Sequence, residues 1–144
     1  MIEQDTIKLL RECDAGVKMG ISSIDDVIDR TEKTELREVL RKCKQAHEDL
    51  HEKIQFRLMK FQDEGKDPNP IAKGMSYMKT TFKLGLKESD QTIASLMTDG
   101  CNMGVKSLNR YLNEYEAAEE YAKDIAKRLI KLEEELTQEL KAYL

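Results

Sequence analysis

The chain has 144 residues, with 24 Lys and Arg against 28 Asp and Glu and a formal net charge of −4. Charged residues make up 36% of the sequence and aromatic residues only 6%, with no Trp and two Pro. This composition is typical of long charged helices around an aliphatic core and excludes a disordered chain. The acidic balance argues against a nucleic-acid partner, and no apolar run approaches the roughly 20 residues of a membrane span.

The three cysteines, Cys13, Cys43 and Cys101, are far apart and form no CxxC pair. The first residues lack the basic start and apolar run of a signal peptide. Both features predict a reduced, cytoplasmic protein. Its length suits one domain over residues 1–144.

The first helix is expected to begin at Asp5 or Thr6, since either side chain can cap a helix. A turn at residues 31–34 leads to a second helix over residues 35–63, which Gly65 and two prolines then end. Each helix has one apolar stripe at helical spacing. The stripes are Ile7, Leu10, Asp14, Val17, Ile21, Ile24 and Ile28, then Leu36, Leu40, Cys43, His47, Leu50, Ile54, Leu58 and Phe61.

Three further helices are predicted: a short one over residues 70–84, a fourth that starts at Ser89 or Asp90, and a fifth over residues 117–144. The fourth stripe is Ile93, Met97, Cys101, Gly104, Leu108, Tyr111 or Leu112, and Tyr115. The fifth is Ala118, Ala122, Ile125, Leu129, Leu132, Leu136 and Leu140. No strand pattern appears, so the chain is predicted to be an antiparallel helical bundle. The short third helix can run back along the bundle, so that the second and fourth helices point the same way.

Four stretches resemble the ferritin-like superfamily, most closely the bacterial ferritin-like domains of unknown function. They are residues 9–16, the break at 65–70, the segment 78–85 and Asp99-Gly100-Cys101. The resemblance covers nearly the whole chain and implies an antiparallel four-helix bundle with an additional short crossover helix. None of the four stretches is a catalytic motif, so the resemblance supports the fold more than an activity.

Ferritin-like di-iron proteins direct a Glu from two helices and a Glu-x-x-His motif from the other two into the bundle. The one matching string is Glu48 to His51, but Glu48 lies about 120° from the centre of its apolar stripe. The fifth helix contains no His, and Glu12 and Asp99 also point away from their stripes. We therefore expect no conventional di-iron centre.

Two polar residues interrupt the apolar stripes, Asp14 in the first helix and His47 in the second. If the hairpin closes near residue 32, they lie within about one turn of the same height. We predict a buried, hydrogen-bonded Asp14–His47 pair that fixes helix register. The alternative is a proton-transfer or ligand site. The metal candidates for that alternative, with iron or another transition metal, are Asp14, His47, His51 and Cys43.

Glycines share a face on two helices, Gly16 with Gly20 and Gly100 with Gly104. Glycine destabilises a helix interior, so its presence suggests close helix packing or, alternatively, a small cavity near Cys101 and Gly104. The cysteines are expected to be small core residues, with a thiolate site as the alternative.

The predicted function is a non-enzymatic helical module that acts through self-association or protein binding. A homodimer is the first expectation, with Leu9, Val27 and Met59 as candidates for the partner surface. No catalytic residue and no cofactor are predicted. The alternative is a metal- or cofactor-binding bundle with a non-standard site around His47.

Overall fold

A computed structural model describes residues 2–68 and 89–144 of the chain. Its four long helices are α1 (Ile2–Val27), α2 (Thr34–Met59), α5 (Asp90–Glu114) and α6 (Glu120–Leu140). Short 3-10 helices follow α1 at Ile28–Arg30 and α6 at Lys141–Tyr143. Within the described ranges there is no strand, which confirms the all-α prediction. The helix predicted over residues 70–84 lies outside the described residues.

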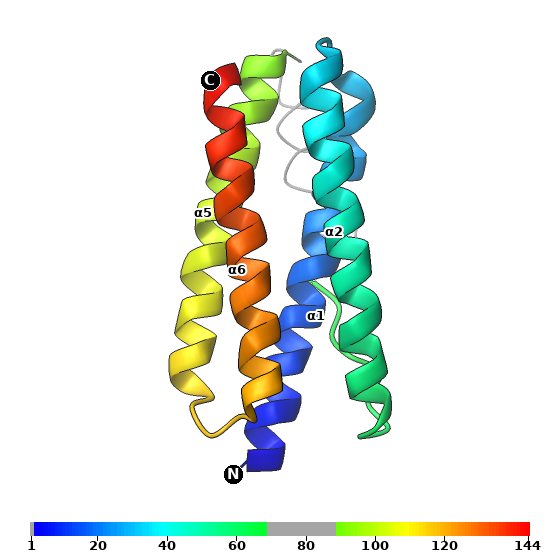
Figure 1. The fold of residues 1–144 in the computed structure, drawn as a ribbon, viewed down its shortest axis with the longest axis vertical. Coiled ribbons are helices and arrows are strands. Elements are labelled where there is room, and N and C mark those ends of the chain that lie inside the picture. The colour runs from blue at the N-terminus through cyan, green and yellow to red at the C-terminus, as the bar shows by residue number, and fades with distance from the viewer. Residues whose placement is uncertain (1, 69–88) are drawn as a thin grey trace.

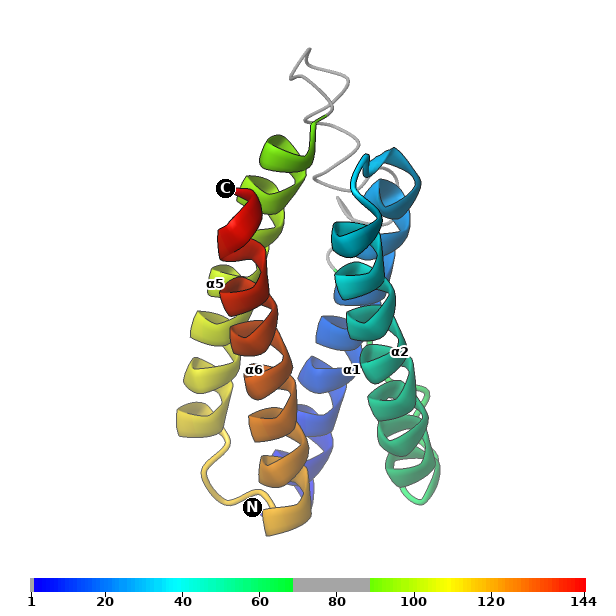
Figure 2. The ribbon, with the colours of Figure 1, turned by 45° about the horizontal axis from the view of Figure 1, so that its top comes forward.

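The four helices lie side by side in two antiparallel hairpins, α1 with α2 and α5 with α6 (Figure 1). The helices α2 and α5 run in the same direction, as the sequence predicted for the second and fourth helices. Both views place the N-terminus and the C-terminus at opposite ends of the bundle (Figures 1 and 2). The two hairpins meet mainly through α6, which contacts both α1 and α2, and through a contact of α1 with α5.

The start of α1 contacts the turn between α5 and α6. Asp5 Oδ2 accepts a hydrogen bond from the backbone N–H of Ala117 at 3.1 Å, and Thr6 Oγ1 accepts one from Glu119 N–H at 2.9 Å. The expectation that Asp5 or Thr6 caps α1 is wrong, because α1 begins at Ile2. Both side chains instead satisfy backbone donors just before α6 begins.

The start of α5 contacts the turn between α1 and α2 in the same way. The carboxylate of Asp90 accepts hydrogen bonds from the backbone N–H groups of Glu32 and Lys33, at 2.8 and 3.0 Å. Lys33 is the N-cap residue of α2 and makes no side-chain capping bond of its own. Ser89, as predicted, caps α5 by accepting from Thr92 N–H. Each hairpin turn is therefore capped by the first turn of a helix from the other hairpin.

The helix α2 ends before the glycine that was expected to end it. Gln62 has a φ of 57°, and Asp63 N–H and Gln62 N–H bond to the carbonyls of Leu58 and Met59. This is the left-handed closing pattern of a Schellman motif, with Gln62 where glycine is most common. The predicted end at residue 63 is a few residues late for that reason.

The core consists of two apolar clusters, one toward each end of the bundle. Members of the first include Leu10, Val17, Leu50, Ile54, Leu58, Leu108 and Leu129. Members of the second include Ile24, Leu36, Leu40, Ile93, Met97, Cys101, Leu136 and Leu140. Leu9 and Val27 are fully buried in these clusters and cannot form a partner surface, whereas Met59 is 68% exposed.

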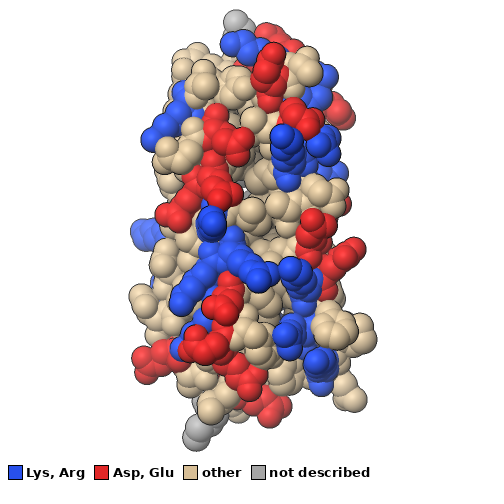
Figure 3. All heavy atoms as spheres, in the orientation of Figure 1, with Lys and Arg blue, Asp and Glu red and all other residues tan. Residues whose placement is uncertain are grey.

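Lys, Arg, Asp and Glu are intermixed over the face that Figure 3 shows, with no large area of one sign. No helix among the described residues has the length and apolar character to cross a membrane. The visible charge pattern is that of a solvated helical face.

Candidate functional site

His47 of α2 is 1% exposed and lies where the two hairpins meet. Its Nδ1 is 2.8 Å from the backbone carbonyl oxygen of Cys43, one turn earlier in α2, and its Nε2 is 3.1 Å from Glu133 Oε1 of α6. The thiol of Cys43 lies 3.5 Å from Nδ1 as well. The ring packs directly on Gly20 of α1. Three helices therefore fix this one side chain.

The partners of His47 determine its charge. A carbonyl oxygen and a carboxylate oxygen can only accept, so both ring nitrogens donate and the ring is an imidazolium. Burial lowers the pKa of His47, but hydrogen bonds with Cys43 and Glu133 outweigh burial and raise the pKa to about 10. At neutral pH the site contains a charged His47–Glu133 pair between the two apolar clusters.

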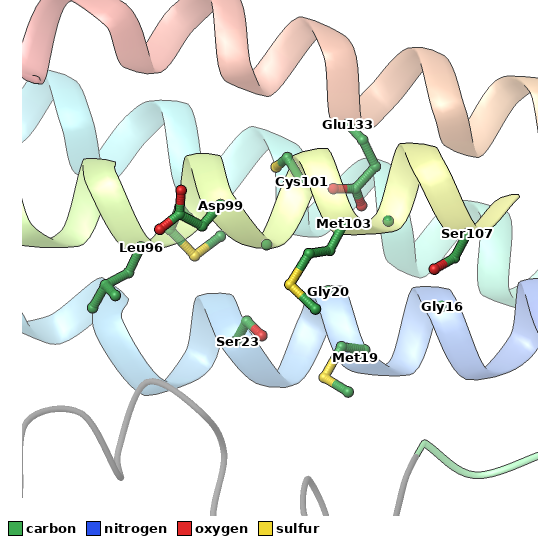
Figure 4. Close-up of a pocket in the computed structure, with 13 residues that line it drawn as sticks. Gly16, Met19, Gly20, Ser23, Leu96, Asp99, Cys101, Met103, Ser107 and Glu133 are labelled. Carbon is green, nitrogen blue, oxygen red and sulfur yellow. The ribbon is translucent and has the colours of Figure 1, made fainter. Parts of the chain in front are cut away.

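Next to this pair, a cavity of about 430 Å³ opens between α1 and α5 (Figure 4). Glu133 and Cys101 line it on the bundle side, together with Gly104 and Gly100 of α5. A Cβ atom built on Gly100 would meet no atom within 4 Å, and one on Gly104 would meet only Glu133, at 3.7 Å and beyond. At Gly100 and Gly104 the structure thus favours the alternative explanation, a cavity near Cys101 and Gly104, over close helix packing.

The glycines of α1 serve close packing instead. A Cβ atom on Gly20 would lie 2.7 Å from His47 Cδ2, and one on Gly16 would lie 3.2 Å from Leu129 Cδ2. The two explanations offered for the glycines therefore apply to different helices. Those of α1 let α2 and α6 approach, and those of α5 leave space.

Apolar groups dominate the wall of the cavity, with the thioethers of Met19, Met97 and Met103 among them. The thiol of Cys101 is 2% exposed, and burial raises its pKa, with the carboxylate of Glu133 raising it further. The thiol is thus neutral and inert at physiological pH. Among the lining side chains, carboxylates come only from Glu133 and from Asp99, and Asp99 is exposed.

Asp14 is fully buried in a second polar cluster on the other side of α1. Its oxygens lie 2.7 Å from Lys18 Nζ, 2.7 Å from Gln55 Nε2 and 3.2 Å from His51 Nε2. The backbone N–H of Lys66 also donates to Asp14, at 3.1 Å. Asp14 thus binds the coil after α2 to α1.

The structure does not bring Asp14 and His47 together, so the predicted pair is wrong although both residues are buried. In the α1–α2 hairpin, His47 faces Gly20, while Asp14 faces His51 and Gln55. About 9 Å of helix rise separates Gly20 from Asp14. The 3-10 turn after α1 lengthens the connection and shifts the register.

The four metal candidates fall into two separate pairs, Asp14 with His51 and His47 with Cys43. Within the described ranges, no group of three or more His, Cys, Asp or Glu side chains is placed to bind a metal ion. Glu48 is 45% exposed beside Lys44, as its angular position predicted.

Glu12 and Asp99 were also predicted to point away from their stripes, and both lie away from His47. The side chain of Glu12 is 13% exposed because Lys66 covers it. Asp99 is exposed at the edge of the cavity. Neither joins the His47–Glu133 pair.

Glu133 is the site residue that sequence reasoning missed. The positions of Leu129, Glu133, Leu136 and Leu140 follow the four-then-three spacing of one helix face. Leu132 was placed in that stripe because it is apolar, but it is only half-buried. The sequence signal for Glu133 is therefore a charged residue at a position where the helical spacing predicts burial.

Comparison with protein-family models, curated proteins and solved structures gives no match for this chain.

Proposed function

We propose that the chain is a non-enzymatic binding protein, and that its ligand occupies the cavity between α1 and α5. One observation carries this proposal: an apolar cavity of about 430 Å³ with the carboxylate of Glu133, whose side chain is 13% exposed, in its wall. Ligand sites are commonly apolar cavities of roughly 300–1,000 Å³ with a few polar groups that orient the ligand. The glycines of α5 keep this space open although each costs the helix about 1 kcal/mol relative to alanine.

The protonation of the polar groups at the cavity favours ligand binding over catalysis. His47 donates from both ring nitrogens and so offers no lone pair to act as a base. The raised pKa of the Cys101 thiol leaves no thiolate to act as a nucleophile. The groups at the cavity are thus suited to orienting a ligand.

The proposal includes a ferritin-like topology with a crossover helix over residues 70–84. The parallel direction of α2 and α5 supports it, because α2 ends and α5 begins at opposite ends of the bundle. Ile71, Met75, Met78 and Phe82 supply the apolar stripe for such a helix. Hydrogen exchange on these residues in the full chain tests this part, and protection at helical spacing is the expected result.

The binding proposal is tested with naphthalene, whose fluorescence is measured easily because the chain has no Trp. Gly100→Leu fills open space and is expected to weaken naphthalene binding by about tenfold or more. Asn102→Leu is the matched control, since Asn102 is exposed on the same helix and does not line the cavity. Failure of naphthalene to saturate the native chain, or equal binding by Gly100→Leu, would contradict the proposal.

Self-association is a second proposal, which keeps Met59 from the predicted partner surface and adds Phe56 in place of Leu9 and Val27. Phe56 and Met59 of α2 are 58% and 68% exposed and lie one helical turn apart. Light scattering of the native chain and of Met59→Lys tests it. A dimer mass that Met59→Lys converts to a monomer mass is expected, and a monomer mass for the native chain rejects it.

A further inference from the structure

We infer that the cavity between α1 and α5 selects an apolar ring compound that carries one neutral hydrogen-bond donor, a hydroxyl or an N–H, which Glu133 Oε2 accepts. This inference rests on the proposed function and names the chemical class of the ligand. Three features of the cavity support it: the Glu133 oxygen that faces Gly104, the charge balance behind it and the shape of the wall along α5.

The carboxylate of Glu133 presents its two oxygens to different surroundings. Oε1 is 3.1 Å from His47 Nε2, whereas Oε2 faces Gly104, where a Cβ atom would lie 3.8 Å from it. Figure 4 shows the Glu133 side chain descending from α6 to the cavity between Cys101 and Met103. A carboxylate can accept about four hydrogen bonds, and His47 and the Cys101 thiol account for two of those to Glu133. A ligand atom against Gly104 is therefore close to an oxygen that can accept a further hydrogen bond.

The charge balance favours a neutral donor. His47 already compensates the charge of Glu133, so a bound ammonium group would bring an uncompensated charge into an apolar wall. An ammonium group also has three donors, and the cavity wall offers it few acceptors. A carboxylate ligand would meet Glu133 with no donor of its own. One hydroxyl or N–H group matches one available oxygen.

The shape and chemistry of the wall favour a ring. Gly100 and Gly104 lie one turn apart and leave a strip of α5 without side chains, which a flat molecule can approach closely. Met19, Met97 and Met103 line the cavity with thioethers, which make favourable contacts with the edges of aromatic rings. Methionine side chains also adapt to the outline of a rigid ligand.

The test compares three probes of matched ring size on the native full chain: 2-naphthol, 2-methoxynaphthalene and 2-naphthoate. Their dissociation constants are measured by fluorescence. We expect 2-naphthol to bind about tenfold or more tightly than 2-methoxynaphthalene, which lacks only the donor, because a hydrogen bond to a charged acceptor has about that effect. Binding of 2-naphthoate should be the weakest.

Two variants test whether Glu133 is the acceptor of the ligand's hydrogen bond. Glu133→Gln is expected to reduce the preference for 2-naphthol over 2-methoxynaphthalene, whereas Asp99→Asn, at the exposed edge, is expected to preserve it. Because Glu133→Gln also breaks the contact with His47, its helix content is measured by circular dichroism. If it does not fold, the probe series on the native chain and on Asp99→Asn decides the inference.

The outcomes separate the inference from the proposed function. Equal binding of 2-naphthol and 2-methoxynaphthalene overturns the donor inference and leaves the proposed function in place. A preference that disappears in Asp99→Asn overturns the assignment to Glu133. Binding of none of the three probes, nor of naphthalene, overturns both.

Discussion

At the scale of single residues, the buried side chains of Asp14 and His47 belong to two separate polar clusters, one with His51 and Gln55 and one with Glu133. The apolar stripes correctly placed Asp14 and His47 inside the bundle. Their partners depend on the relative register of the helices, which a periodic pattern does not specify. Glu133 was missed because a neighbouring leucine satisfied the pattern equally well.

The charge on His47 makes stability depend on pH. The pKa is about 10 in the folded chain, above the ordinary value of 6.5, so the stabilisation is complete below pH 6.5 and is lost as the pH rises through 10. Each pKa unit corresponds to about 1.4 kcal/mol, so we expect a loss on the order of a few kcal/mol between pH 6.5 and 10. Urea unfolding of the native chain across this range measures it.

His47→Gln is the control for this dependence, since glutamine does not titrate. The native chain should lose more unfolding free energy than His47→Gln over the same interval. Parallel pH profiles of the two proteins would show that His47 is not charged in the folded state.

Alanine substitutions at two glycines, Gly100 and Gly20, should change the free energy of unfolding in opposite directions. Gly100→Ala adds a methyl group in open space and should raise the free energy of unfolding by about 0.5–1 kcal/mol. Gly20→Ala places the same group 2.7 Å from His47 and should lower it by about 1 kcal/mol or more, despite the same gain in helix propensity. Urea unfolding compares them, and stabilisation by Gly20→Ala would contradict the described packing.

At the scale of the elements, the sequence located all four described helices but not all of their ends. Ser89 caps its own helix and was found, because that signal is local. The α1 start and the caps of the two hairpin turns were missed, because the side-chain oxygens of Asp5, Thr6 and Asp90 accept hydrogen bonds from distant backbone N–H groups. Tertiary capping leaves no local pattern in the sequence.

The cap provided by Asp90 can be removed without changing the helix that it stabilises. Asp90→Ala should destabilise the chain by about 1–2 kcal/mol, since two backbone donors at the start of α2 lose their acceptor. Hydrogen exchange should accelerate at the amides of Glu32 and Lys33. Gln91→Ala, at the next and exposed position, is the control, and equal exchange rates in both variants would contradict the role of Asp90.

At the scale of the whole molecule, one polar layer separates two apolar clusters. Composition and periodicity predicted the all-α class, and the expected parallel direction of the second and fourth helices is observed. The division of the core could not be predicted, because it needs a histidine of α2 and a glutamate of α6 at the same height. The cavity lies beside this division, where packing is interrupted.

Converting the polar layer into apolar core should join the two clusters. His47→Leu or Glu133→Met alone leaves a charge without its partner and should cost about 3 kcal/mol. The double variant should be as stable as the native chain or more so, since replacement of a buried ion pair by apolar groups is often neutral or stabilising. Urea unfolding of all four proteins forms a double-mutant cycle, and simple additivity would contradict the pairing.

The two-hairpin arrangement has a consequence for folding kinetics. Contacts within each hairpin join residues near in sequence and can form early, whereas His47 and Glu133 are 86 positions apart and meet only when the hairpins dock. Interactions that form after the transition state affect mainly the rate of unfolding. We therefore expect loss of the His47–Glu133 contact to accelerate unfolding while the refolding rate changes little, so that this contact determines how long the bundle stays closed.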